Sequence, residues 1–424
     1  MVNIRRGFKA KKMKLNIGIG FVTGRKHFQN VLRSYINNWL EHGLVQDKNI
    51  RLHIFVAYDL KYQSTQASDY KNIPPELAQM VDSIHFYGGD KIKTEIQNLK
   101  DDGILKDTEA EMLFGEGYGK KRNVITYFAI KNKMDRLIFI DDDEYPMATM
   151  KNKYHKLVWM GQSVIGTHLK YSADADITHG HHCGYISPIP YIRFNDVLTE
   201  KDFKQFIEAL SNDIITWEKI KNVIVYNKGV TYADEDLLNK SIVTEVIEDS
   251  GMKFISGANL CFNLSNTENL PPFYNPPGAR GEDTFMSTAL SKVKVLKVPC
   301  YTFHDGFSMY NNILNGALPV SLDAIDSVSP VNLKRFINAT IGWVRYKPLL
   351  VYITKRERFQ QTMIEMEEKL NRTIPKLGVY FETNDFEKIH KELAYYRKNV
   401  VKHFNDFEAT KRAWAKLMQE MREK

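Results

Sequence analysis

The sequence predicts an α/β protein, with a mostly parallel β-sheet flanked by helices and a helical region at the C-terminal end. Short apolar runs alternate with amphipathic segments up to about residue 145, a pattern typical of strands and helices that build a parallel sheet. Beyond about residue 330 the apolar residues recur with helical spacing. With 424 residues and 43% hydrophobic content, the chain is long and apolar enough for two or three domains.

The first 145 residues contain the expected elements in a regular order. Strands are predicted at residues 15–22, 51–57, 83–87 and 136–140, and helices at 28–40, 75–81 and 119–131. Ligands of such sheets gather at the carboxyl ends of the strands. Polar residues directly after three of these strands are therefore the first candidates for a site: Thr23, Asp59 and Asp141–Asp143.

The middle of the chain is less regular. From about residue 146 to 255 we expect an insertion that shapes one side of the site, with a Gly/His-rich loop at 178–185, an acidic helix at 199–210 and a β-like stretch at 223–226. Regular structure then returns, with an ordered run at 254–263, a Pro/Gly loop at 271–281, a helix at 282–290 and a strand at 293–298. Residues 14–330 are thus predicted to form one domain.

The C-terminal region, residues 331–424, is predicted to be basic and helical. It holds 20 Lys and Arg against 12 Asp and Glu, whereas the first 330 residues hold 39 of each. This surplus suits attachment to an anionic membrane, an oligomerisation arm, or a solvated face that covers the rest of the protein. A heptad stripe favours either a long helix packed on its own domain or a dimerising coiled coil: Phe386, Leu393, Val400, Phe407, Trp414 and Met421.

Cysteine content and hydropathy point to a cytoplasmic protein. Cys183, Cys261 and Cys300 are too few and too scattered for a disulfide framework, which indicates a reducing compartment. The apolar run at 15–22 follows a basic stretch but lacks a cleavage site, so we expect a buried strand rather than a signal peptide. No segment reaches the roughly 18 apolar residues of a membrane span. Peripheral attachment at the inner face of the membrane is the alternative to a free cytoplasmic location.

The acidic tract Asp141-Asp142-Asp143-Glu144 is the strongest candidate for a chemical site. Four adjacent carboxylates at the end of a buried strand repel one another unless a cation lies among them. Asp141 and Asp143 are two residues apart and face the same way in an extended segment. Their oxygen ligands suit Mg²⁺ or Mn²⁺. The alternative is a solvated acidic turn, which the apolar strand before the tract disfavours.

Three further segments carry groups suited to an anionic ligand or to proton transfer. Gly115–Asn123 is a Gly-rich turn that opens a helix with a basic first turn, which suits phosphate but is also a common turn. Gly278–Thr284 brings Glu282 and Asp283 to a helix start, where a carboxylate serves as a general base or only as a cap. His304 follows a strand and either completes a metal site or has a structural role.

The histidine-rich segment His179–His182 leaves three interpretations open: a metal site, contacts to substrate or phosphate, or an exposed polar loop. Three imidazoles within four residues rarely converge on one ion from a single loop.

In order and spacing these segments resemble the GT-A glycosyltransferases, particularly the family-2-like group of inverting enzymes. The resemblance covers roughly residues 14–310 and departs from the family at the end of the first strand, Val22-Thr23-Gly24-Arg25 in place of Pro-Thr-Tyr-Asn. About 140 residues also separate the DxD-like and "ED"-like motifs, more than is usual. The motifs that carry the resemblance are the opening strand Ile17–Thr23, the second strand Phe55–Asp59, the Gly-x-x-x-Arg-Asn-like segment Gly119–Asn123, the DxD-like segment Phe139–Asp143, the "ED"-like pair Glu282–Asp283, and His304.

The resemblance implies a GT-A catalytic domain at residues 14–330, with an acceptor-shaping insertion at about 146–255. Such an enzyme transfers a sugar from a nucleotide-diphosphate sugar, expected to be a UDP-sugar, to a hydroxyl of a glycan, a polyol-type acceptor, or a wall or capsule polymer of the cell envelope. Asp143 and His304 would bind Mn²⁺ or Mg²⁺, with Asp141 sharing the ion or contacting the ribose. Asp283, with Glu282 beside it, would act as the base that gives inversion. Contacts to the donor are implied for Thr23, Asp59, Lys121, Arg122, Asn123, Asp141 and Asp142.

Two other functions compete with this interpretation. A sugar-nucleotide pyrophosphorylase shares the nucleotide-binding layout but needs a Gly-rich loop after the first strand, where this chain has only Gly24. A nucleic-acid-binding protein would use the basic C-terminal helices, which leaves the acids at the strand ends without a role. We therefore expect no nucleic-acid partner, and a homo-oligomer through the C-terminal helix remains one of the two interpretations of the heptad stripe.

Overall fold

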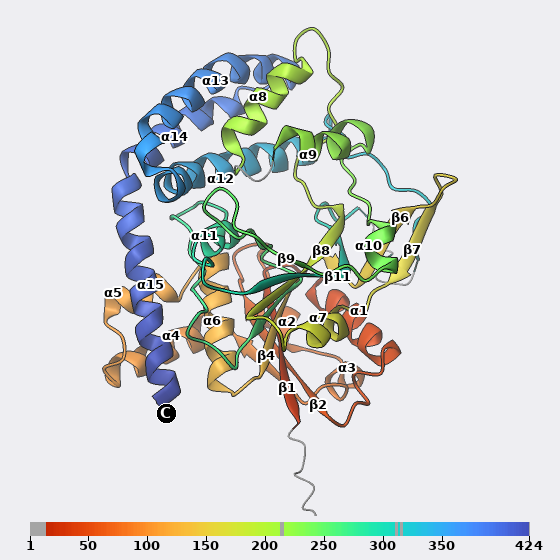
Figure 1. The fold of residues 1–424 in the computed structure, drawn as a ribbon, viewed down its shortest axis with the longest axis vertical. Coiled ribbons are helices and arrows are strands. Elements are labelled where there is room, and N and C mark those ends of the chain that lie inside the picture. The colour runs from red at the N-terminus through yellow and green to blue at the C-terminus, as the bar shows by residue number, and fades with distance from the viewer. Residues whose placement is uncertain (1–13, 213–215, 310–312, 314–316, 424) are drawn as a thin grey trace, which may run out of the picture.

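A nine-stranded sheet runs through the centre of the computed structural model, which describes residues 14–212, 216–309, 313 and 317–423 (Figure 1). The strand order is β3-β2-β1-β4-β10-β8-β11-β5, and β9 pairs with β11. A hairpin of β6 (Met147–Lys151) and β7 (Leu157–Gly161) forms a second, two-stranded sheet. The strands of the central sheet are β1 (Leu15–Thr23), β2 (Ile50–Tyr58), β3 (Ser83–Tyr87), β4 (Arg136–Asp141), β5 (Glu144–Tyr145), β8 (Ile177–Tyr185), β9 (Thr244–Glu245), β10 (Leu260–Asn263) and β11 (Val295–Asp305).

This sheet is mixed rather than mostly parallel. β3, β2, β1 and β4 are parallel neighbours, and β8 and β11 also pair in parallel. β10 lies antiparallel between β4 and β8, and both β5 and β9 are antiparallel to β11. Parallel pairs need crossover connections, which the helices of the first 141 residues supply. The α/β class is therefore confirmed, and the expected parallel order holds in the half of the sheet that these residues build.

Two segments of the middle region differ from their predictions. Residues 178–185, expected to be a loop, belong to strand β8 inside the sheet, between β10 and β11. Gly180 is required there, because a Cβ at this position would collide with the side chain of Asn259. Residues 223–226, expected to be β-like, lie in a π-helix, Asn222–Tyr226, that continues α9 (Trp217–Lys221). Ile224 packs there in a core built by helices, so tertiary packing overrides the β-preference of Val and Ile.

Helices cover both faces of the sheet, and β1 shows how the sequence sets these faces. Every second residue of β1, namely Ile17, Ile19 and Phe21, packs in the core that the sheet shares with α1 (Phe28–Glu41). Gly20 points to the opposite face of the sheet. A Cβ on Gly20 would lie 2.8 Å from Cγ2 of Ile125, so this glycine lets α6 (Tyr118–Lys131) approach the sheet. The remaining helices around the sheet are α2 (Ala67–Lys71), α3 (Pro75–Ala78), α4 (Gly89–Asp101), α5 (Asp107–Leu113), α7 (Val164–Tyr171) and α10 (Glu235–Asn239).

The middle region and the C-terminal region share a separate hydrophobic core. In Figure 1, α8 (Glu200–Leu210) lies among the C-terminal helices α12 (Pro330–Thr354), α13 (Phe359–Tyr380) and α14 (Lys388–Lys398). The rings of Phe206 and Phe386 are 6.0 Å apart between centroids. The segments on the two sides of the boundary predicted at residue 330 therefore share a common core. The acidic helix predicted at 199–210 packs against the C-terminal helices.

The heptad stripe packs within the chain itself. Its helix is interrupted at Asn399, after which α15 (Val400–Glu423) runs along the side of the sheet beside α5 and α6 (Figure 1). Trp414 is buried there, and its indole N–H donates to the carbonyl of Leu270 at 2.9 Å. Of the two interpretations of this stripe, the structure shows a helix packed on its own protein. Across the described ranges, every helix is either too short or too polar to traverse a lipid bilayer.

Candidate active site

The predicted polar residues meet at one edge of the central sheet. Thr23 ends β1, Asp59 follows β2 and Asp141 ends β4, so three parallel strands bring them to the same edge. The N-terminal turn of α6, the short helix α11 (Glu282–Ser287) and the end of β11 border the same region. Ion pairs join these segments, which are widely separated in the sequence.

Arg25 provides one of the positive charges that the acidic tract requires. Its Nε lies 3.1 Å from Oδ1 of Asp142, and its Nη2 lies 2.6 Å from Oδ2 of Asp143. The hydroxyl of Thr23 donates to the other oxygen of Asp142 at 2.6 Å. Asp142 and Thr23 are both buried. Asp142 therefore anchors the turn after β4 to the end of β1.

Arg122 is the second internal cation and is almost fully buried. Its Nη2 donates to Oδ1 of Asp141 at 2.8 Å, and its Nε lies 3.7 Å from Oε1 of Glu282. Its Nη1 donates to the carbonyl of Gly257, and its guanidinium lies 5.1 Å from the ring centroid of Phe139. Arg122 thus ties the acidic tract to the start of α11.

Asp283 lies beside this ion-pair network, on the first turn of α11. The N–H of Thr284 donates to its Oδ1 at 2.7 Å. Burial raises the pKa of Asp283 above its ordinary value, against the opposing effects of the Thr284 N–H, the charge of Arg122 and the Gly257 N–H. A partly buried carboxylate that holds its proton more tightly is suited to accept one from a substrate hydroxyl.

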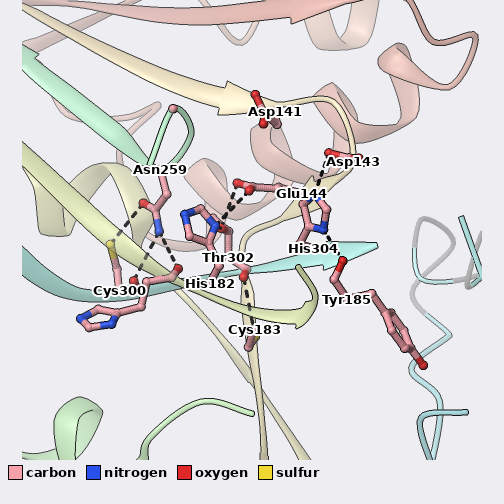
Figure 2. Close-up of polar contacts among 12 residues, drawn as sticks. Asp141, Asp143, Glu144, His182, Cys183, Tyr185, Asn259, Cys300, Thr302 and His304 are labelled. Atoms are coloured by element: carbon pink, nitrogen blue, oxygen red, sulfur yellow. Dashed lines mark hydrogen bonds and ion pairs between the residues drawn. The ribbon is translucent and has the colours of Figure 1, made fainter. Parts of the chain in front are cut away.

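His304 and Asp143 form the part of the site that fits a divalent cation (Figure 2). Nδ1 of His304 lies 2.7 Å from the carbonyl oxygen of Tyr185, and because a carbonyl only accepts, this nitrogen carries the proton. Nε2 then faces Oδ1 of Asp143 at 3.5 Å. A metal-ligating histidine typically donates its other N–H in this way. Mg²⁺ and Mn²⁺ suit such a site, because they bind through few protein ligands together with substrate phosphates.

The described residues contain no cluster of three His, Cys, Asp or Glu side chains arranged to hold a metal by themselves. Asp141, the third predicted ligand, is paired with Arg122 instead, and the second oxygen of Asp143 is paired with Arg25. Asp143 and His304 are therefore the two protein groups that fit the ion.

The three aspartates of the tract differ in how tightly they hold a proton. Burial raises the pKa of Asp141 and of Asp142 to about 7, despite the opposing charges of Arg122 and Arg25. Burial acts to raise the pKa of Asp143, but interactions with His304, Arg25 and Arg335 and a backbone hydrogen bond outweigh it, so the pKa is lowered. Asp143 is thus the acid of the DxD-like pair that stays ionised most readily, as expected of a metal ligand.

Lys121 and Asn123, two of the predicted donor-binding residues, have different surroundings. Nζ of Lys121 lies 3.1 Å from Oδ2 of Asp59, so these two residues form an ion pair at the edge of the site. Asn123 is fully buried, and its side chain exchanges two hydrogen bonds with the backbone of Phe273 and donates a third to Leu113. The structure therefore gives Asn123 a positioning role, holding α6 to the loop before α11, in place of the ligand contact that the resemblance implies.

The histidine-rich segment is part of the buried sheet, so the exposed-loop interpretation was wrong. Nδ1 of His182 lies 3.0 Å from Oε1 of Glu144, whose other oxygen accepts from the Thr302 hydroxyl at 2.9 Å (Figure 2). His179 is also buried, and burial lowers its pKa, which keeps the ring neutral. His182 and Thr302 thus hold Glu144, the last acid of the tract, in place within the sheet.

Sequence reasoning missed Arg25, Arg335 and the pairing of Glu144 with His182, two residues that it placed in separate candidate segments. Arg25 had a local signal, because it lies two residues after the first strand, at a position where the family motif differs. The other two depend on contacts between residues far apart in the chain, since Arg335 of α12 donates to the carbonyl of Gly306. No model of a known protein family matches this chain, and no curated protein matches it either.

Proposed function

We propose that this protein is a metal-dependent glycosyltransferase that transfers a sugar from a nucleotide-diphosphate sugar to a hydroxyl acceptor with inversion. The observation that carries the proposal is the pair of Asp143 and His304, with Oδ1 and Nε2 facing each other at 3.5 Å and the imidazole oriented by a backbone carbonyl. A carboxylate and an oriented imidazole at the carboxyl ends of parallel strands suit a cation that carries a diphosphate.

The parallel half of the sheet supports a GT-A-like arrangement. Its order is β3-β2-β1-β4, the acidic tract lies at the end of β4, and Asp59 directly follows β2 at the same edge. In this proposal β1, β2 and α6 hold the donor. Asp283 and the loop around Gly257 face the acceptor, for which we propose a glycan or polyol-type hydroxyl of the cell envelope.

The residues of the chain would divide the reaction as follows. Asp143 and His304 would hold a Mn²⁺ or Mg²⁺ ion, which would stabilise the charge of the departing nucleoside diphosphate. Arg122 holds Asp141 and Glu282 in place. Asp283 accepts the proton of the acceptor hydroxyl while the hydroxyl oxygen attacks the anomeric carbon of the donor sugar. The chain thereby supplies the base on the face opposite the leaving group.

Measuring metal binding tests directly whether Asp143 and His304 form a cation site. We expect Mn²⁺, followed by electron paramagnetic resonance of the free ion, to bind the protein in the presence of a nucleoside diphosphate. His304→Ala should weaken this binding at least about 10-fold, because even loss of a supporting group costs about 10–100-fold in metal affinity.

The matched control is His42→Ala, which removes an exposed histidine outside the site. Equal Mn²⁺ affinity in the His304→Ala and His42→Ala proteins would show that His304 is not a ligand. Equal affinity in Asp143→Asn as well would remove the basis of the proposed function.

A further inference from the structure

Arg335 reaches the candidate site from the C-terminal helical region. It lies on α12, yet its Nη1 donates to the carbonyl of Gly306 just after β11. Its guanidinium lies 4.5 Å from the ring centroid of Phe307. A Cβ on Gly306 would lie 2.5 Å from both Nη2 of Arg335 and Cε1 of His304. The absence of a side chain at Gly306 therefore lets the guanidinium and the imidazole lie next to each other.

Arg280 approaches the same place from the loop before α11. Its aliphatic stem packs over Gly342 of α12, where a Cβ would lie 2.8 Å from Cδ of Arg280. Arg25 and Arg280 are both close enough to Arg335 to act against its positive charge: burial lowers the pKa of Arg335, and these two arginines lower it further, while Asp143 opposes them. Arg25 and Arg335 thus lie beside the Asp143–His304 pair, and Arg280, packed on the same helix as Arg335, is near enough to repel it.

The charges of this group are not balanced by the protein. Arg25 has Asp142 and Asp143 as partners, whereas neither Arg280 nor Arg335 has a carboxylate within ion-pair distance in the described ranges. Nε of Arg335 is buried and has no hydrogen-bond partner there. Arg335 is partly buried, so its unpaired charge is costly, and its buried Nε–H without an acceptor adds to that cost. An anionic ligand would satisfy both.

We infer that Arg280 and Arg335, with Arg25 at their border, form a subsite for a phosphate-bearing group of the substrate, so that the C-terminal region completes the active site. Guanidinium groups bind phosphate oxygens through paired, charge-assisted hydrogen bonds, and the free Nε of Arg335 offers one more donor. The inference rests on the proposed function for the identity of the substrate. The phosphate belongs either to the diphosphate of the donor or to a phosphorylated acceptor, since both would present the same chemistry.

The test is calorimetric titration of the full-length protein with inorganic pyrophosphate. We expect Arg335→Gln and Arg280→Gln each to weaken binding about 10-fold or more, and Arg335→Lys to recover part of the loss, because charge without the planar fork binds phosphate less well. Lys334→Gln, which removes the neighbouring exposed cation on α12, should bind like the unaltered protein. Arg280 is exposed, so its variant tests the subsite even if the Arg335 variant is poorly folded.

A second titration identifies the source of the phosphate. Displacement of pyrophosphate by UDP or GDP assigns the subsite to the donor, and simultaneous binding of both assigns it to the acceptor. Absence of pyrophosphate binding, or equal affinity in the Arg280→Gln, Arg335→Gln and Lys334→Gln proteins, would overturn the inference. If the pyrophosphate test fails but the protein still binds nucleoside diphosphate in a metal-dependent way, the proposed function stands and only the subsite is lost. Pyrophosphate binding without any transferase activity would leave the subsite standing.

Discussion

Replacing Asp283 by Asn is expected to lower sugar transfer about 10²–10⁴-fold, the usual contribution of a general base, while donor binding stays unchanged. The carboxylate lies beside the Arg122 network, but it makes no ion pair within the described ranges, so the amide should disturb the fold little. Turnover of the preferred donor and acceptor, together with the donor Kd, measures the two effects separately.

Asp90→Asn is the matched control, because Asp90 is also the second residue of a helix, α4, but is exposed and follows β3, three strands from β4 in the sheet. It should leave turnover unchanged. A pH profile adds an independent check: Asp283 works as a base only when ionised, so the rate should fall as the pH decreases through its raised pKa. That acidic limb should lie above the ordinary aspartate range of about pH 4. Full activity of Asp283→Asn would remove Asp283 from the mechanism.

Replacing Arg122 by Met is expected to lower the free energy of unfolding by about 3–5 kcal/mol, the usual cost of removing one partner from a buried ion pair. The change leaves Asp141 and Glu282 without their cation and the carbonyl of Gly257 without its donor. Urea denaturation followed by circular dichroism measures the loss.

Two comparisons make this prediction specific. Arg33→Met removes an exposed ion pair with Glu76 and should cost no more than about 1 kcal/mol. Adding Asp141→Asn to Arg122→Met should recover part of the stability, because the amide removes the uncompensated carboxylate. A loss under about 1 kcal/mol in Arg122→Met would show that the network does not stabilise the fold.

The first half of the sheet could be predicted because its signals are local. β1, β2, β3 and β4 are apolar runs bounded by polar residues, and their carboxyl ends mark the site in the sequence itself. β8 carried no such signal. Its side chains include histidines and glycines that become buried only because β10 and β11 flank the strand.

The charge balance of the site also depends on distant residues. The acidic tract predicted a cation, and a divalent metal ion was the cation expected there. The structure places Arg25 and Arg122 among the acids, which divides the tract into Asp141 and Asp142, paired inside the protein, and Asp143, which faces His304. Which arginine pairs with which carboxylate follows from the packing of α6 and β1 and has no counterpart in sequence spacing.

The most direct test of the central claim is release of nucleoside diphosphate from a panel of nucleotide sugars, measured with Mn²⁺ and with EDTA. The proposed site predicts release from one class of donor, dependent on the metal and abolished by Asp143→Asn. Release that is equal with EDTA and in the Asp143→Asn protein, or no release from any donor, would contradict a metal-dependent glycosyltransferase centred on Asp143 and His304.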